Sequence, residues 1–351
     1  MRQTEGRHRA LIVGWTVLAA VAAGSACAAT TAAVAELLVL EKRDRTLAIV
    51  DPKSNTVVAR VPAGEDPHEI VTSSDGRTAY ISNYEGATAP LHTLSVVDVA
   101  ARSARPPVEL GALLAPHGLA LVSGRVYFTA EGSKAVGRYD PCSQRIDWIL
   151  GLGQDRTHMV WVAPDASRMY LTSMYSNTVT VLFHGDKADS SGWNIINIPV
   201  GTGPEGFDVS PDGRELWVAT FGDGRLSIID LAQNRVSASL DLGTRRANRL
   251  KFTPDGQRAL VSDLSSGDLV IIEVAPRRVV SRLHLGGGAS GILIPPQGTV
   301  AYVALSDESA VAVVDLGTLK EVGRVRTGRG PDGMAWAAPG PATTCPTPAS
   351  R

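Results

Sequence analysis

The chain has 351 residues, of which 44% are hydrophobic and only 5% aromatic, and it contains 35 glycines and 21 prolines. This composition favours many short strands joined by tight turns and argues against a helical protein. The formal net charge is −1, and no run of lysine or arginine stands out. We therefore expect neither nucleic acid nor an anionic membrane surface to be a partner.

The N-terminus has the three parts of a secretory signal peptide. Three arginines in the first nine residues precede an apolar run over residues 10–23, and small residues follow. We predict a signal peptide over residues 1–28, with cleavage as late as residue 35 as the alternative, and a periplasmic or secreted protein. Cys27 leaves lipoprotein anchoring open as the less favoured alternative. No other segment is long and apolar enough to span a bilayer.

The rest of the chain is a series of similar units of about forty residues. Residues 37–61 contribute three short apolar segments. Six complete units follow, each with four segments separated by turn residues, over 68–110, 117–150, 158–198, 205–240, 248–283 and 290–325. Residues 332–336 then match only the first segment of a unit. Together the two remainders make a seventh unit.

These units predict an all-β fold, a seven-bladed β-propeller of four-stranded antiparallel blades over residues 36–338. Pro-Asp-Gly turns, as in residues 211–213 and 254–256, separate the strands, because proline restricts φ and glycine accepts a positive φ. The ring closes by pairing one C-terminal strand with three N-terminal strands, which removes open sheet edges. Residues 339–351 form a tail rich in proline, threonine and alanine.

Two strand sequences carry a family resemblance. Residues 79–83 read Ala-Tyr-Ile-Ser-Asn and residues 169–172 read Met-Tyr-Leu-Thr, each close to a reverse-turn sequence. With those turns they resemble the YVTN-repeat propellers, the family that includes the YncE-like periplasmic proteins. The resemblance covers nearly the whole chain after residue 35. It implies the propeller fold but not one function, because propellers include enzymes, binding proteins and scaffolds.

A column of polar residues occupies equivalent positions at the start of the first strands. The column comprises His68, His117, His158, Glu205, Asn248, Ser290 and Asp332. Since the first strand of a propeller blade is innermost, this column should surround one mouth of the central channel. His68, His117, His158 and Glu205 are candidate ligands of a divalent metal such as Zn²⁺.

Other residues near the column are candidates for binding a ligand. Glu205 and Asp332 are candidate ligands or bases, and Arg249 brings positive charge that would suit an anionic ligand. The alternative is that the column is a solvated polar rim without a ligand. The loops between second and third strands should lie on the same face, and Asn83 and Tyr84 are our best candidates for a ligand pocket there. Those loops also contribute Glu131 and Phe221.

Two cysteines remain after cleavage beyond Cys27. Cys142 lies in a turn between third and fourth strands, and Cys345 follows the last innermost strand, so both should emerge opposite the histidines. A disulfide between them is conceivable with blade 1 intervening, and we leave this pairing open. No Cys-x-x-Cys-His sequence occurs, which excludes covalent c-type haem.

Three functional hypotheses follow. The first is an extracytoplasmic binding protein that holds a small ligand, a divalent metal or a protein partner at the channel mouth. The second is a metal-assisted lyase or lactone hydrolase, by fold-level analogy with virginiamycin B lyase and the gluconolactonases. The third is a protein interaction scaffold. We expect a monomer.

Overall fold

The computed structural model describes Met1 and residues 35–184, 192–341 and 345. Apart from Met1, the predicted signal peptide lies outside the described residues, and so does Cys27. Strands extend from Glu36 to Ala337. No described helix is long and apolar enough to cross a membrane.

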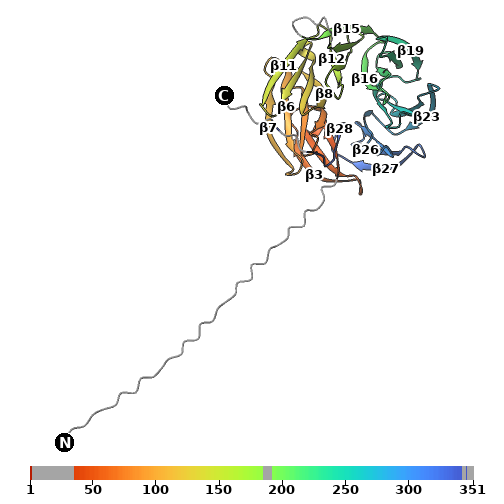
Figure 1. Ribbon diagram of the computed structural model, residues 1–351. Helices are drawn as coiled ribbons and strands as arrows, with labels where there is room; N and C mark the ends of the chain where they lie inside the picture. Colours follow the sequence, from red (N-terminus) through yellow and green to blue (C-terminus); the bar gives the residue numbers. More distant parts are fainter. Residues whose placement is uncertain (2–34, 185–191, 342–344, 346–351) are drawn as a thin grey trace. The chain divides into compact units, whose positions relative to one another are not determined.

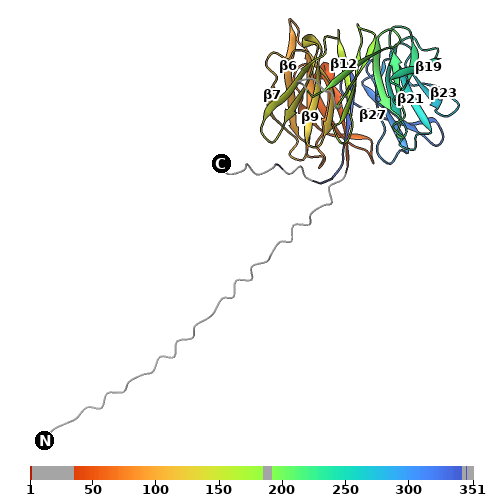
Figure 2. The ribbon, with the colours of Figure 1, turned by 45° about the horizontal axis from the view of Figure 1, so that its top comes forward.

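The described residues form seven four-stranded antiparallel sheets arranged as blades in a ring (Figure 1). In Figure 2 the strands of each blade run roughly along the axis of the ring. The predicted all-β, seven-bladed propeller is therefore confirmed.

Six blades take four consecutive strands each, ordered from the channel outward. Blade 1 comprises β4 (Pro67–Thr72), β5 (Thr78–Glu85), β6 (Pro90–Asp98) and β7 (Ser103–Glu109). Blade 2 comprises β8 (Pro116–Val122), β9 (Arg125–Ala130), β10 (Ala135–Asp140) and β11 (Arg145–Gly151). Blade 3 comprises β12 (Thr157–Val162), β13 (Arg168–Ser173), β14 (Thr178–Phe183) and β15 (Asn194–Pro199). Blade 4 comprises β16 (Pro204–Val209), β17 (Glu215–Thr220), β18 (Arg225–Asp230) and β19 (Arg235–Asp241). Blade 5 comprises β20 (Ala247–Phe252), β21 (Arg258–Asp263), β22 (Asp268–Glu273) and β23 (Arg278–His284). Blade 6 comprises β24 (Ala289–Leu293), β25 (Val300–Leu305), β26 (Ala310–Asp315) and β27 (Lys320–Arg326).

The closing blade joins the two ends of the described strands. It comprises β28 (Pro331–Ala337), β1 (Glu36–Glu41), β2 (Thr46–Asp51) and β3 (Thr56–Pro62), in that order from the channel outward. Leu37 pairs with Trp336 and Leu38 with Ala335, in antiparallel register. The predicted closure by one C-terminal and three N-terminal strands is confirmed. Two single turns of 3₁₀ helix, η1 (Lys42–Asp44) and η2 (Glu131–Ser133), connect second and third strands.

Position within a blade explains the residue pattern of each strand. Strand β2 buries Leu47, Ala48, Ile49 and Val50 in succession, because neighbouring blades cover both of its faces. The outermost strand β3 instead alternates between exposed and less exposed residues along most of its length. The hydrophobic core is accordingly divided into clusters between facing blades, as where Tyr80 and Leu94 of blade 1 meet Phe128 of blade 2.

The predicted reverse turns have the expected backbone geometry. Gly213 and Gly256 adopt φ angles of 70° and 67°, which glycine accepts without a steric penalty. The Gly213 amide donates to the Ser210 carbonyl oxygen at 2.8 Å, and the Ser210 hydroxyl donates to the Asp212 carboxylate at 2.6 Å. These contacts explain why the turn sequence recurs between first and second strands.

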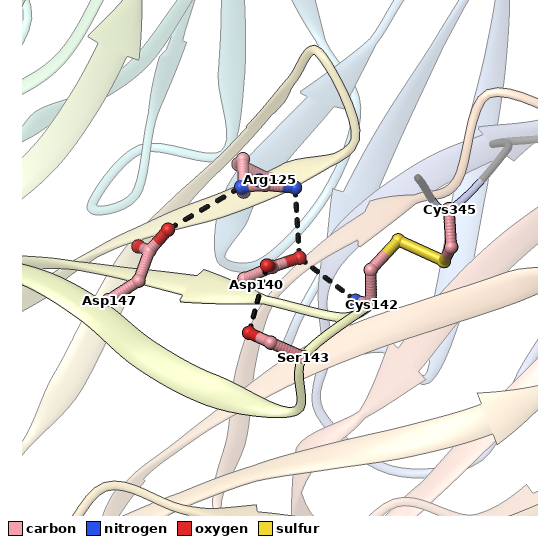
Figure 3. Close-up of a disulfide and its surroundings, with 6 residues drawn as sticks. All are labelled: Arg125, Asp140, Cys142, Ser143, Asp147 and Cys345. Atoms are coloured by element: carbon pink, nitrogen blue, oxygen red, sulfur yellow. Dashed lines mark hydrogen bonds and ion pairs between the residues drawn. A yellow bond between two sulfur atoms is a disulfide. The ribbon is translucent and has the colours of Figure 1, made fainter. Parts of the chain in front are cut away.

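A disulfide joins Cys142 to Cys345, with the two Cα atoms 5.4 Å apart (Figure 3). The segment that follows β28 passes blade 1, where the Ser74 hydroxyl donates to the Pro341 carbonyl oxygen at 3.0 Å. Beside the disulfide, Asp140 accepts hydrogen bonds from the Cys142 amide at 2.9 Å and the Ser143 hydroxyl at 2.8 Å (Figure 3). The pairing left open by the sequence therefore exists in the structure, and it links the closing strand to blade 2.

Candidate functional site

A β-bulge at the start of each inner strand places the column residues. In β4, Pro67 pairs with Asn83 and Ile70 with Ile81, so His68 and Glu69 fall within a shift of register. The inner strands of blades 2 to 6 have the same irregularity at the same place. Bulges redirect side chains away from regular sheet pairing. The column residues, which recur at equivalent positions of the repeat, therefore lie near one another at one end of the inner strands.

The three histidines form a stack. The ring centroids of His117 and His158 are 3.7 Å apart, and those of His68 and His117 are 4.4 Å apart. His117 is 0% exposed and His158 is 3% exposed, so a solvated rim does not describe these two residues. Neither ring nitrogen of His117 has a hydrogen-bond partner among the described residues. Burial, with His158 and His68 alongside, holds the pKa of His117 well below its usual value.

His158 lies between two carboxylates. Its Nδ1 atom contacts Glu131 Oε1, and its Nε2 atom lies 2.8 Å from Glu205 Oε1. Burial opposes the charged imidazolium, but the Glu205 and Glu131 carboxylates outweigh it and raise the pKa of His158 to about 9. Burial likewise opposes ionisation of Glu205, yet His158 and Arg249 hold the pKa of this carboxyl well below its usual value.

Arg249 crosses the channel. Its Nη1 atom donates to Glu205 Oε1 of blade 4 at 2.5 Å, and its Nη2 atom donates to Glu69 Oε1 of blade 1 at 2.5 Å. Arg249 is 8% exposed, and the Asn248 amide also donates to Glu205 Oε1 at 3.2 Å. The guanidinium is thus a buried bridge between opposite blades, whereas the sequence suggested only positive charge near the column.

His68 belongs to a second ionic group. Its Nε2 atom lies 3.0 Å from Lys42 Nζ, and its Nδ1 atom lies 3.5 Å from Asp66 Oδ2. Lys42 Nζ also lies 3.4 Å from Asp332 Oδ2. Burial raises the pKa of Asp332, but Lys42 and His68 outweigh it and hold that pKa below its usual value. Sequence reasoning missed Lys42, although η1 is itself a connection between second and third strands.

The two predicted pocket residues have different surroundings. The Tyr84 hydroxyl donates to Glu131 Oε2 at 2.5 Å, and the Tyr84 ring lies edge-on to His117 with centroids 5.1 Å apart. The Asn83 side chain instead donates to the Ala63 carbonyl oxygen at 2.9 Å and accepts from the Thr93 and Ser95 hydroxyls. Tyr84 is therefore part of the histidine group, and the structure does not bring the Asn83 amide into it.

One set of side chains could hold a metal ion. His117, Glu131 and His158 each offer a ligand atom, and these atoms lie within 4.8 Å of one another. The set combines two of the predicted metal ligands with Glu131, which the sequence placed only in a nearby loop. His68 and Glu205, the other two predicted metal ligands, lie outside it. Glu131 and Glu205 approach opposite ring nitrogens of His158. The sequence does not show which of the two carboxylates lies with His117, because that depends on how the blades pack.

A cavity of about 850 Å³ opens above this group. Its polar lining includes Lys42, Asp66, His68, Arg156, His158, Glu205, Arg246, Asn248, Arg249 and Asp332. Met174, Phe221 and Leu264 add an apolar part. The mouth therefore has the size and the mixed lining of a site for a small molecule.

No protein-family model matches the sequence, and no curated protein does. Solved structures do match. Hydrazine synthase of Kuenenia stuttgartiensis is similar at 22% identity and a TM-score of 0.66, over 78% of this chain and 90% of that chain. The periplasmic gluconolactonase of Pseudomonas aeruginosa is similar at 16% identity and a TM-score of 0.69, over 87% of this chain and 99% of that chain.

A third similar structure is the dihydro-heme d1 dehydrogenase NirN, at 17% identity and a TM-score of 0.60, over 85% of this chain and 74% of that chain. At these identities the likeness shows the propeller fold alone. The resemblance to YVTN-repeat proteins stays a prediction.

Proposed function

We propose that this protein is an extracytoplasmic binding protein that holds a divalent first-row metal ion at the floor of its channel mouth. His117, Glu131 and His158 would be the ligands. The observation that carries the proposal is His117, a fully buried imidazole with no hydrogen-bond partner for either nitrogen among the described residues. Buried polar groups without partners are rare, and a metal ion would satisfy this one.

The surroundings of the three ligands support a metal of this kind. Two imidazoles and one carboxylate suit Zn²⁺ and its first-row neighbours. Metal ligands are usually oriented by further hydrogen bonds. Here Glu205 faces His158 Nε2, and the Tyr84 hydroxyl donates to the Glu131 oxygen that does not face His158. His158 Nδ1 and Glu131 Oε1 face each other beside His117 and share a proton, which a metal ion would release to solvent on binding.

Calorimetric titration of chelator-treated protein with Zn²⁺ tests the metal site. We expect saturable binding of one ion per chain, with loss of affinity of about tenfold or more in Glu131→Gln and His117→Ala. His68→Ala is the matched control, because it removes a column histidine outside the group and should retain binding. Circular dichroism would confirm that each variant is folded. Absence of Zn²⁺ binding in the wild type, or equal binding in wild type and His117→Ala, would refute the site.

The disulfide supports an extracytoplasmic location. Disulfides persist in oxidising compartments, and Cys142–Cys345 joins two parts of the propeller in the structure. The predicted signal peptide points the same way. Fractionation of cells that produce the full chain should recover the protein outside the cytoplasm, with no free thiols in the denatured mature form. Recovery in the cytoplasm with Cys142 and Cys345 as free thiols would contradict this location.

Metal-assisted lactone hydrolysis is a second candidate function. The cavity opens directly on His158 and Glu205, and a similar solved structure is a gluconolactonase. A bound metal ion would polarise a carbonyl group and lower the pKa of water. Zn²⁺-loaded protein should then release acid from glucono-δ-lactone faster than the Glu131→Gln variant does. Equal rates of hydrolysis by the wild type and Glu131→Gln would refute the hydrolytic function but would not affect the proposed metal binding.

A further inference from the structure

The wall of the mouth formed by blades 3, 4 and 5 carries two arginines. Arg156 lies beside the metal group, with its Nε atom 3.4 Å from Glu131 Oε2, whereas among the described residues Arg246 has no contact with that group. Arg246 precedes β20, and its guanidinium lies over the Phe221 ring, 4.2 Å from the centroid. Arg156 precedes β12, and its guanidinium lies over the Tyr175 ring, 5.0 Å from the centroid. Met174, which follows β13, lines the same wall. Two cations are thus stacked on aromatic rings at the edge of one cavity.

The charge of Arg246 is available to a ligand. Within residues 35–184 and 192–341 no carboxylate forms an ion pair with Arg246, whereas Arg249 and Lys42 are already paired. A guanidinium whose face covers an aromatic ring still presents its N–H edge, which matches a carboxylate in two parallel hydrogen bonds. Glu205 of blade 4 also lines the mouth, but it is paired with Arg249. Asp66 precedes β4 and Glu85 ends β5, so both lie at blade 1, on another part of the ring. They would direct an anionic group toward Arg246.

Space for the rest of the ligand lies beside this charge. A second cavity of about 440 Å³ shares Arg156, Met174 and Phe221 with the mouth and continues between blades 3 and 4. Its other lining residues include Tyr175, Thr202 and Gly203. Aromatic and thioether side chains favour a flat, apolar body, which stacks on a ring at little cost in conformational freedom.

We propose that this wall binds a small organic anion with a flat, unsaturated body. Arg246 takes the carboxylate, and the body packs between Phe221 and Met174. This site goes beyond the metal site, because none of Arg246, Phe221 and Met174 belongs to the metal group.

Three carboxylates are suitable probes: benzoate, phenylacetate and cinnamate, each titrated calorimetrically into chelator-treated protein. We expect saturable binding of at least one of them, with benzamide and acetate each binding about tenfold more weakly than the best probe or worse. Benzamide has the aromatic ring but not the negative charge, and acetate has the carboxylate but no aromatic ring. Binding of benzamide as tight as that of benzoate would overturn the anionic assignment, and absence of binding by all three carboxylates would overturn the site.

Variants locate the binding. Arg246→Gln should weaken binding of the best probe about tenfold or more, and Phe221→Ala should weaken it as well. Arg245→Gln is the matched control, because Arg245 is the exposed neighbour that does not line the mouth. An Arg246→Gln variant that binds the probe as tightly as Arg245→Gln would refute the proposal.

The same titration distinguishes this site from the metal site. His117→Ala should bind the probe as the wild type does, since His117 does not line the cavity. Loss of Zn²⁺ binding with retained probe binding would separate the two proposals. Loss of probe binding in His117→Ala would show that the anion is held at the metal group and would overturn the wall as its site.

Discussion

His117 and Arg249 are both buried, but their polar atoms have opposite surroundings. Arg249 donates to two carboxylates from opposite blades, and these pairs offset the cost of removing its charge from water. The His117 imidazole has no such partner in the described part of the chain. Buried side chains whose polar atoms are hydrogen-bonded stabilise the ring. A buried polar group without a hydrogen-bond partner instead indicates a site for a ligand.

Asp332 provides a pH-dependent test of the second ionic group. Its pKa is lower in the folded protein than the ordinary value of 3.8. The ionised carboxylate therefore stabilises the folded state above pH 3.8, and that contribution is lost as pH falls through the folded-state pKa. Asp332→Asn should lower the free energy of unfolding at neutral pH, and the gap to the wild type should narrow in acid.

Urea denaturation at several pH values measures this gap. Asp307→Asn is the matched control, since Asp307 forms an exposed ion pair with Arg43, and such pairs contribute little. A gap for Asp332→Asn that stays constant from neutral pH to below pH 3.8 would contradict the role assigned to the carboxylate.

At the scale of elements, the approach of neighbouring inner strands sets the geometry of the mouth. A Cβ atom added to Gly118 of β8 would lie 2.5 Å from the His158 carbonyl oxygen of β12. Gly206 of β16 has the same relation to Asn248 of β20, also at 2.5 Å. The glycine after a column residue thus allows adjacent inner strands to come close, which brings the column residues into contact.

Gly118→Ala should therefore destabilise the protein by about 1 to 3 kcal/mol, because the new methyl group meets a backbone carbonyl that cannot move alone. Gly151→Ala is the matched control, since Gly151 lies in β11 and its added Cβ would meet no atom within 4 Å. Chemical denaturation of both variants measures the difference. Equal stability of the two variants would show that the inner strands can separate without cost.

Only part of the candidate site could be predicted from the sequence. Equivalent positions in a repeat are visible in the sequence, and they correctly placed His117 and His158 side by side. Glu131 begins η2, the connection between second and third strands of blade 2, and nothing in its local sequence shows that it meets His158 of the next blade. Arg249 and Glu69 are separated by 180 positions along the chain, so their pairing depends on the diameter of the ring.

At the scale of the whole molecule, the disulfide secures the closure of the ring. The closing strand β28 is held by pairing with β1. Beyond it, Pro341 contacts Ser74 of blade 1, and Cys345 is bonded to Cys142 of blade 2. The bond spans a sequence separation of 203 residues. A cross-link over such a long loop removes much of the conformational freedom of the unfolded chain.

Replacing both cysteines by serine should therefore lower the free energy of unfolding, by up to about 5 kcal/mol in the chain-entropy description. Equilibrium denaturation of the double variant and of oxidised wild type measures the loss. Reduced wild type is the control and should behave as the double variant does. Identical stability of oxidised wild type and the double variant would show that strand pairing alone secures the ring.

The sequence by itself determined the fold, because each blade repeats the same local information: four apolar segments, turn residues at fixed places and strand lengths that close a ring of seven. It also showed that three histidines occupy equivalent positions in neighbouring blades, and the structure stacks their rings. Only the tertiary structure decided which polar groups meet across blades. That choice placed Glu131 with His117 and His158, Lys42 with His68 and Arg249 across the channel, since such contacts depend on the approach of the inner strands and the width of the ring. The pairing of Cys142 with Cys345 is likewise a contact between different parts of the ring, which the tertiary structure decided.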